Sequence, residues 1–529
     1  MNRSGTKHPL KPVSRALLVP ALVLAVGLLI VPRSLAAAPP GPGRPNVLIL
    51  HVDQLRFDCL GACGNRDVKT PNLDRLAADG VRYVNSFCEF PVCTPSRYTL
   101  ISGRPTFEHR GWDNRSTLAP TFNTFPKILR AAGYRTKAVG KMHYTPTYLD
   151  VGFDEMVLAE QDGPGRWDDD YHRYLMRLDL VDRNDLEDQR AEYRSHARRE
   201  YWDTMGALVS NLPEEHHSTT WIGDRAAESI RSWDSRRSHL LMVGFIKPHH
   251  PFDPPAPWHT MYDPEKLALL PGWTNEVFPH DFQFARGYFP YDRLSEAGLH
   301  RVMAYYYANI SLIDQQVGWL IALLKEKRLY DNTLVVFTAD HGEYMGFHHM
   351  TLKANHMYDP LAKVPLLVKW PGGRRAGTVS ERLVSNIDLA PTLCRAAGLC
   401  PDAGMHGEDL GADGPNRRIV FCEQGPPVMA RTRESKLLVM GGPPEKDLFF
   451  DLRRDPLEMH NLAGTPQVQD EIKRLRAAIA AWRPKPLQPH YVDLSAPQIR
   501  GPNVPPPGLD HRQAVIEYFE AKMREGNGR

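Results

Sequence analysis

Two apolar segments that each end in polar side chains suited to metal binding constrain the fold of this chain most. The segments and the residues that follow them are 46–52 with Asp53-Gln54, and 334–339 with Asp340-His341. Such apolar runs are typical of parallel strands that are buried on both faces of a sheet. Open α/β sheets place their sites at the carboxyl ends of the strands. We therefore expect an α/β fold in which these two strands are neighbours and their terminal side chains converge.

The side chains at these two strand ends favour a hard divalent cation. Asp53, Gln54 and Asp340 offer oxygen atoms, which favours Ca²⁺, with Mg²⁺ as the second option. His341 could bind the ion or only form a hydrogen bond. A lone aspartate after a strand more often caps a helix. Two such pairs with a cysteine motif between them argue for a metal site instead.

The cysteine motif occupies residues 93–97, which read Cys-Thr-Pro-Ser-Arg, and residues 100–104 read Leu-Ile-Ser-Gly-Arg. The first segment matches the C-x-P-x-R signature of type I sulfatases, and the second resembles the continuation of that signature. A short motif alone can arise by chance, and Cys93 could then be an ordinary buried or disulfide-bonded thiol. The chain, however, resembles the sulfatase family at five separated motifs, in the family's order, over nearly all of residues 44–463.

This resemblance implies that a maturation enzyme, an expected partner, oxidises Cys93 to Cα-formylglycine. The aldehyde hydrates to a diol, and one diol oxygen attacks the sulfur of a sulfate ester and expels the alcohol. Deprotonation of the other oxygen releases sulfate and restores the aldehyde. A serine or an unmodified cysteine has no second hydroxyl, so this covalent route depends on the modification. The resemblance also places Arg97 beside the formylglycine and adds the side chain of residue 93 to the metal site.

Two motifs implied by the resemblance supply sulfate-binding and proton-donating groups. Residues 140–143 resemble G-K-x-H, in which the lysine, here Lys141, contacts the sulfate and the histidine, here His143, holds the diol. In extended geometry these two side chains point to one side. Residues 247–252 resemble K-P-H-x-P-F, which implies that His249 is the general acid for the leaving alcohol. The adjacent His250 is the alternative.

Further candidates lie outside these motifs. Lys353 matches the lysine that pairs with sulfate oxygens, whereas we expect His348 and His349 on the surface rather than at the mouth of the site. Asn114 resembles the asparagine that replaces a sulfate-binding lysine in choline-sulfatase-like and phosphonate-hydrolase-like members. Gln54 stands where many sulfatases have a second aspartate, a difference also found in phosphonate monoester hydrolases.

The chain is expected to divide into four parts. Residues 1–38 combine basic residues, an apolar run and a small-residue cleavage site near Ala38, which predicts a signal peptide and a secreted or periplasmic enzyme; an uncleaved membrane anchor is the alternative. The resemblance implies a catalytic domain at 44–400, with a large mixed, mostly parallel sheet flanked by helices. An α+β subdomain at 401–484, with a small antiparallel sheet, and a proline-rich tail at 485–529 follow. The charged segment 162–218 is an insertion that shapes the substrate mouth or a merely solvated helical region.

Composition excludes some partners. The 529-residue chain has a net charge of +3, which is too small to indicate binding to nucleic acid or to an anionic membrane, and we expect no stable membrane partner. Of its 7 cysteines, the six other than Cys93 could pair in an oxidising compartment or remain free.

Three hypotheses follow from these patterns. The first is a sulfatase that acts on a small-molecule or saccharide sulfate ester. The second is a phosphonate or phosphate mono- or diester hydrolase on the same scaffold. The third is a catalytically silent binding protein, against which the complete set of site residues argues.

Overall fold

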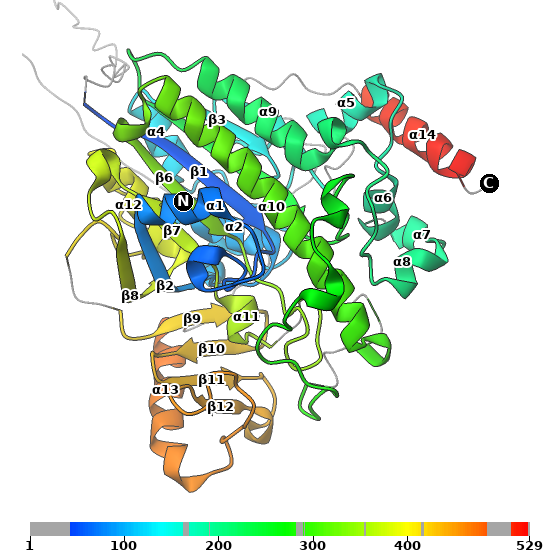
Figure 1. Ribbon diagram of the computed structural model, residues 1–529. Coiled ribbons are helices and arrows are strands. Elements are labelled where there is room, and N and C mark those ends of the chain that lie inside the picture. The colour runs from blue at the N-terminus through cyan, green and yellow to red at the C-terminus, as the bar shows by residue number, and fades with distance from the viewer. Residues whose placement is uncertain are drawn as a thin grey trace, which may run out of the picture. The chain divides into compact units, whose positions relative to one another are not determined.

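A mixed sheet carries the residues that the sequence places at the site (Figure 1). The computed structural model describes residues 43–161, 169–189, 191–281, 289, 291–353, 356–413, 417–483 and 509–526. Within these ranges the sheet has eight strands in the order β4-β3-β5-β1-β6-β7-β2-β8. In chain order they are β1 (Asn46–Asp53), β2 (Val81–Phe87), β3 (Arg135–Gly140), β4 (Glu155–Leu158), β5 (His239–Pro248), β6 (Thr333–Ala339), β7 (Leu366–Lys369) and β8 (Thr378–Ser385). Since β7 alone among them runs antiparallel to its neighbours, the expected mostly parallel α/β sheet is confirmed.

The central strands β1, β5 and β6 are buried along their whole length because helices cover both faces of the sheet. Along β1, Leu48 and Leu50 pack into one core cluster, whereas Val47 and Ile49 pack into another. The first cluster includes side chains of α1 (Pro71–Ala78), α9 (Ser218–Arg231) and α10 (Glu296–Glu326), and the second includes α2 (Cys93–Ser102), α4 (Phe125–Ala131) and α12 (Leu389–Ala396). This alternation is the period of two expected of a strand that is buried on both sides.

Local sequence signals set the starts of the long helices. The Ser295 side chain accepts a hydrogen bond from the backbone N–H of Gly298 at the start of α10, and Thr124 does the same for Lys127 at the start of α4. Such caps satisfy backbone donors that have no partner within the helix. Both helices therefore begin directly after a residue whose side chain caps them.

The expected C-terminal antiparallel sheet is present. Its strands are β9 (Val420–Glu423), β10 (Val428–Arg431), β11 (Ser435–Val439) and β12 (Leu448–Asp451), in the order β12-β11-β10-β9. Helix α13 (Gln469–Trp482) packs Ile472 and Leu475 against this sheet. A buried ion-pair network joins the sheet to α11 (Asp359–Ala362): Asp359 pairs with Arg431 at 2.9 Å and with Lys436 at 2.6 Å.

The charged segment after residue 161 is not a merely solvated region. It forms α5 (Asp170–Arg177), α6 (Arg183–Gln189), α7 (Ala191–Arg194) and α8 (Arg199–Asp203), and the polar residues of α6 from Asn184 to Gln189 are buried. Helix α14 (Leu509–Gly526), within the expected tail, packs on α5 through Phe519 and His172, whose ring centroids lie 5.4 Å apart. The sequence interpretation had missed this helix because the residues before it are rich in proline.

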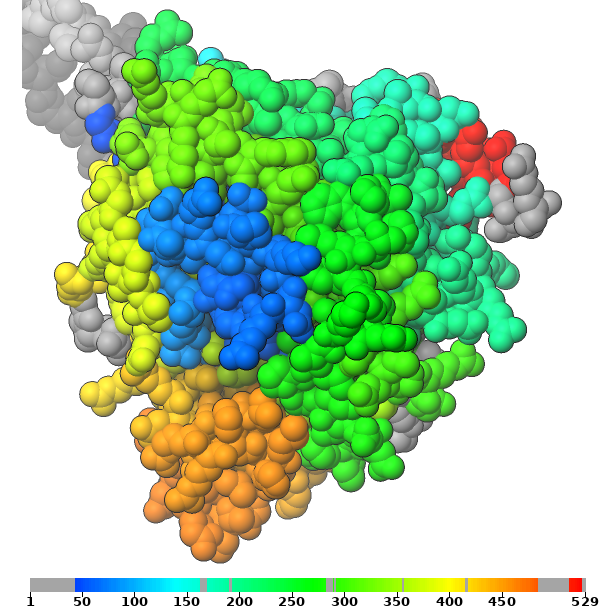
Figure 2. Space-filling view, in the orientation of Figure 1, coloured from blue at the N-terminus to red at the C-terminus, as the bar shows by residue number. Residues whose placement is uncertain are grey.

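A long excursion at residues 254–281 packs against the loop that precedes α1. Over these described residues its regular structure is limited to short 3-10 turns at Trp258–Thr260 and Pro264–Lys266. The Tyr262 hydroxyl accepts a hydrogen bond from the backbone N–H of Lys69, and Asp67 accepts one from Ala268. In Figure 2 green residues of this excursion accordingly border the blue surface around α1.

Other expectations meet the structure only in part. The signal segment at 1–38 and most of the tail lie outside the described residues, and the four-part division remains a prediction. No helix among the described residues is long and apolar enough to cross a membrane. All seven cysteines lie in described segments, and each is a free thiol, so the pairs that an oxidising compartment could form are absent.

Candidate active site

Four adjacent parallel strands bring their carboxyl ends together. In the order β3-β5-β1-β6, each strand is parallel to the next. The residues at or just after their ends are Lys141 after β3, His249 after β5, Asp53 on β1, and Asp340-His341 after β6. All of these side chains are buried. The sheet therefore gathers residues that are up to 288 positions apart in the chain (341 minus 53).

A candidate metal centre lies at this convergence. Ligand atoms of Asp53, Cys93, Asp340 and His341 all lie within 4.8 Å of one another, and every member is buried. His341 Nε2 is 3.8 Å from Asp53 Oδ1 and 3.9 Å from Asp340 Oδ1. Ligand atoms about 2.3–2.6 Å from a shared Ca²⁺ would be separated by such distances.

Gln54 adds an oxygen that suits the same ion. Its amide nitrogen donates to Glu343, and its Oε1 is buried without a hydrogen-bond partner among the described residues. Its backbone N–H donates to Asp340 Oδ1 at 3.0 Å, and its carbonyl accepts from the Tyr306 hydroxyl on α10 at 2.7 Å. A buried acceptor without a partner is costly, and a hard cation would remove that cost.

Two cations neutralise the other oxygen of each carboxylate. Arg97 lies between Asp340 Oδ2 at 3.0 Å and Asp53 Oδ2 at 3.2 Å, and Lys141 Nζ lies 2.6 Å from Asp53 Oδ2. Burial opposes ionisation of Asp53, yet Lys141, His249 and Arg97 hold its pKa well below the usual value. Arg97 thus holds the carboxylates, in addition to the position beside residue 93 that the resemblance implies.

Cys93 occupies the first turn of α2, facing this centre. Its Sγ lies 3.3 Å from Lys353 Nζ, 3.4 Å from His341 Nε2 and 3.6 Å from Asp53 Oδ1. The N-terminus of a helix favours negative charge. Burial, reinforced by Asp53, nevertheless raises the pKa of the Cys93 thiol to about 11. The surrounding side chains alone therefore leave residue 93 as a protonated thiol.

His249, rather than His250, contacts Lys353, whose Nζ also contacts Cys93. His249 Nδ1 lies 2.6 Å from the His250 carbonyl, which can only accept, so Nδ1 carries the proton and Nε2 points to Lys353 Nζ at 3.3 Å. Burial first, then His250, Lys141 and Lys353, hold the pKa of His249 well below its usual value. The imidazole of His250 is instead 2.6 Å from Asp188 on α6.

His143 and Asn114 hold the backbone next to Cys93. The His143 carbonyl accepts a hydrogen bond from the Thr94 hydroxyl at 2.7 Å, and Asn114 Oδ1 accepts one from the Thr94 N–H at 3.2 Å. The expectation that residues 141–143 are extended is wrong, because His143 adopts φ 53°. Its N–H donates to Glu160 at 2.9 Å, which stabilises this left-handed turn.

Sequence reasoning missed several residues that position the site. Glu160 accepts from the backbone N–H groups of Met142 and His143, and Gln161 Oε1 accepts from Lys141 Nζ at 3.2 Å. Glu160 and Gln161 follow the apolar residues of strand β4, much as Asp53 and Gln54 follow those of β1. The sequence signal that identified Asp53 and Gln54 could therefore have identified this pair as well. Glu343 accepts from the N–H groups of Met345 and Leu352 in the loop before Lys353. Nothing in its sequence neighbourhood indicated that role.

The expectation of surface positions for His348 and His349 is wrong. The exposed fraction of His348 is 0% and that of His349 is 7%. His348 contacts Asp281 and the Leu457 carbonyl, and the His349 ring lies 4.9 Å from that of Trp273. The loop before Lys353 is therefore packed against the 254–281 excursion and the C-terminal segment.

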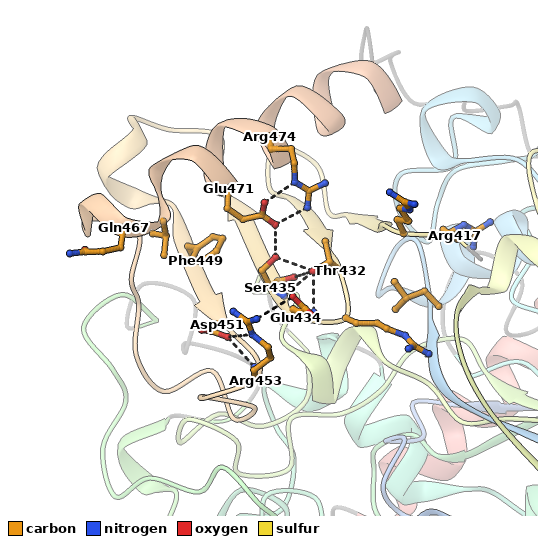
Figure 3. A pocket seen from close by; sticks show the side chains of 14 residues that line it. Arg417, Thr432, Glu434, Ser435, Phe449, Asp451, Arg453, Gln467, Glu471 and Arg474 are labelled. Atoms are coloured by element: carbon orange, nitrogen blue, oxygen red, sulfur yellow. Dashed lines mark hydrogen bonds and ion pairs between the residues drawn. The ribbon is translucent and has the colours of Figure 1, made fainter. Parts of the chain in front are cut away.

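An open cavity elsewhere does not compete with this centre. It has a volume of about 1160 Å³ and lies on the C-terminal sheet, away from every predicted site residue. Figure 3 shows two of its arginines beside carboxylates, Arg474 with Glu471 and Arg453 with Asp451. The two carboxylates neutralise the positive charges of these two arginines.

Comparisons with known proteins assign the chain to a family. Residues 45–399 match the family model described as Sulfatase. The chain belongs to the sulfatase family. It is 28% identical over 482 residues to an arylsulfatase of Clostridium perfringens, covering 82% of this chain and 93% of that protein. It is 29% identical over 446 residues to a choline-sulfatase of Rhizobium meliloti, covering 80% and 83%.

Solved structures agree on the fold. The phosphonate monoester hydrolase of Agrobacterium radiobacter superposes with a TM-score of 0.69 at 24% identity, covering 84% of this chain and 96% of that one. At that identity the likeness concerns the fold alone. Family membership and the two sulfatase relatives support a hydrolase that acts on sulfate esters.

Proposed function

We propose that this protein is a metal-dependent sulfatase whose nucleophile is formed from Cys93. The observation that carries the proposal is the position of Cys93 Sγ, within 3.6 Å of Lys353, His341 and Asp53. One buried atom is thus in contact with a cation and with two candidate metal ligands, and the same cation also contacts His249. This is the arrangement that an attack on an anionic ester requires.

The metal in this proposal is Ca²⁺, with Mg²⁺ as the second option. Asp53, Gln54, Asp340 and His341 would hold it together with residue 93, and Gln54 Oε1, which has no hydrogen-bond partner among the described residues, supports the fit. Oxygen-rich ligand sets favour these hard ions over zinc. When bound, the ion supplies positive charge next to the nucleophile and the sulfate oxygens.

The nucleophile in this proposal is Cα-formylglycine made from Cys93 by a maturation enzyme. The Sγ position stands in for the formylglycine oxygens. Once formed, this group supplies an attacking oxygen and a second hydroxyl whose deprotonation releases sulfate and restores the aldehyde. The raised pKa of the Cys93 thiol supports a need for the modification, since a protonated thiol is a weak nucleophile.

The remaining residues bind the ester and move protons. Lys353 and Lys141 face the sulfate oxygens and counter their charge. His249 presents Nε2, the nitrogen not committed to the His250 carbonyl, and there holds the proton for the departing alcohol. The charge of a bound sulfate offsets the lysines that lower the pKa of His249, so substrate binding itself favours the protonated acid.

The substrate class in this proposal is a small-molecule or saccharide sulfate ester. Asp188 on α6 reaches His250 beside His249, which supports an insertion that shapes the substrate mouth. The basic and apolar residues before 38 support export, so we place the enzyme outside the cell or in the periplasm.

A panel of esters with matched leaving groups tests the proposal. Matured protein saturated with Ca²⁺ should hydrolyse sulfate esters with a kcat/KM far above that for phosphonate and phosphate esters. Cys93→Ala should remove this activity, whereas Cys400→Ala, at an exposed cysteine, should keep it. Equal activity of the Cys93→Ala protein would contradict the assignment.

The second candidate is a phosphonate or phosphate mono- or diester hydrolase. Gln54 in place of an aspartate and Asn114 in place of a lysine favour it, and the solved phosphonate monoester hydrolase shares the fold. Preference for phosphonate esters by a wide margin in the same panel would select this function over the first.

A further inference from the structure

A second cluster of metal-ligand side chains lies apart from Cys93. Ligand atoms of His280, Asp281 and His348 all lie within 4.8 Å of one another. Asp281 and His348 are fully buried, whereas 26% of the His280 side chain is exposed. None of these residues belongs to the sulfatase motifs described above. They join the 254–281 excursion to the loop between β6 and Lys353.

The separations match those of ligands around one transition-metal ion. His348 Nδ1 lies 3.2 Å from Asp281 Oδ2, and His280 Nε2 lies 3.6 Å from the same oxygen. Ligands about 2.0–2.2 Å from a tetrahedral zinc ion are roughly 3.3–3.5 Å apart. An ion could therefore lie between the three atoms with little movement of the side chains.

The hydrogen bonds of His348 leave the lone pair of one ring nitrogen without a donor. His348 Nε2 lies 3.0 Å from the Leu457 carbonyl, which can only accept, so Nε2 carries the ring proton. In the neutral ring Nδ1 then has no proton and faces an Asp281 oxygen, lone pair against lone pair. Either an additional proton or a cation must lie between these two atoms.

Asp281 is oriented to present that oxygen. Its other oxygen, Oδ1, accepts from the Tyr358 hydroxyl at 2.8 Å and lies 3.3 Å from His356 Nε2. Oδ2 is thereby turned toward His280 and His348. His280 Nε2 has no hydrogen-bond partner among the described residues.

The surroundings have the form that metal sites use. Histidine ligands usually donate their second N–H to a carbonyl or carboxylate, and ligating carboxylates are themselves hydrogen-bonded. Leu457 fills the first role for His348, and Tyr358 fills the second for Asp281.

We propose that His280, Asp281 and His348 bind one divalent transition-metal ion of the zinc type, with water completing its coordination. Two imidazoles and one carboxylate suit zinc, whereas calcium prefers oxygen ligands. The ion cross-links the 254–281 excursion to the loop that ends at Lys353. It acts as a brace for the catalytic loop and takes no part in the chemistry at Cys93.

Metal titration of the full chain tests this proposal. The protein is first saturated with Ca²⁺, so that the oxygen-rich site at Asp53 is filled, and Co²⁺ is then added as a spectroscopic substitute for zinc. The wild type should bind one more equivalent of Co²⁺ than His280→Ala and Asp281→Asn and show the visible absorption of tetrahedral Co²⁺. His460→Ala, at an exposed histidine, is the matched control and should behave as wild type. Identical stoichiometry and spectra in wild type and His280→Ala would overturn the proposal, because a lone proton would then bridge Asp281 and His348.

Two further measurements keep the test independent of folding and of the proposed function. Zn²⁺ should raise the Tm of the wild type and His460→Ala but not that of His280→Ala, whose altered side chain is partly exposed. X-ray absorption by the Zn²⁺-loaded wild type should show two imidazole ligands, and an oxygen-only shell would refute the site. Both measurements report on the cluster whether or not Cys93 is modified.

Discussion

Lys353 is the residue whose removal tests the electrostatics of the site most cleanly. Its Nζ lies 3.3 Å from Cys93 Sγ, which marks the position of the nucleophile oxygens. Two full charges at that distance interact by about 5 kcal/mol at an effective dielectric constant of about 20. Only part of a charge develops in the transition state, so we expect Lys353→Met to raise the barrier by about 2–4 kcal/mol, as for the loss of one oxyanion donor. That corresponds to a loss of roughly 30-fold to 10³-fold in kcat/KM.

The assay is kcat/KM on the best sulfate ester of the panel. Lys353 lies outside the C-x-P-x-R motif, so maturation of Cys93 should be unaffected, and peptide mass gives the formylglycine content of each preparation. Lys266→Met, at a lysine whose side chain is 82% exposed, is the control and should retain full activity. A loss below about threefold at equal formylglycine content would refute the role assigned to Lys353.

Four further expectations address the acid, the metal and stability. His249→Ala should lose about 10²–10⁴-fold in kcat/KM on alkyl or sugar sulfates but much less on an aryl ester whose leaving group needs no proton, and equal losses would argue against a general acid. Burial, His250, Lys141 and Lys353 together lower the pKa of His249. Lys353→Met should raise this pKa, so the high-pH limb of kcat/KM should move to higher pH. An unmoved limb would show that Lys353 does not affect the titration of His249. Chelation should abolish turnover and Ca²⁺ should restore it, whereas full activity in a chelator would contradict the metal site. Asp359→Asn should lower the free energy of unfolding by about 3 kcal/mol at neutral pH, because Arg431 and Lys436 lose a buried partner. These cations overcome burial and hold the pKa of Asp359 far below 3.8. The stabilisation is therefore present above pH about 4 and is lost only as the pH falls through the folded pKa. Urea titrations that show no difference between variant and wild type at neutral pH would exclude this stabilising role of Asp359.

The convergence at the sheet could be predicted because parallel strands have a fixed geometry. Asp53 and Asp340 each follow an apolar run, and parallel neighbours necessarily present such residues at one edge. The C-terminal sheet was predicted from the resemblance. Only the convergence therefore rests on the apolar pattern of the strands, which local residues determine.

The parts that were not predicted depend on tertiary contacts. His143 leaves extended geometry because Glu160, which lies just after strand β4, accepts its N–H. His348 is buried because Asp281 and the Leu457 carbonyl contact it, and both lie far from it in the chain. Asp188 reaches His250 only through the packing of α6. No pattern along the chain records such pairings.

The mass of the tryptic peptide 83–97 tests the central claim most directly. The protein is made in a host that contains the maturation enzyme, and Cys88 in the same peptide serves as an internal thiol. We expect residue 93 to have lost its sulfur and two hydrogens and gained one oxygen, as conversion to an aldehyde requires, with Cys88 unchanged. An unmodified Cys93 in fully active protein would contradict the account.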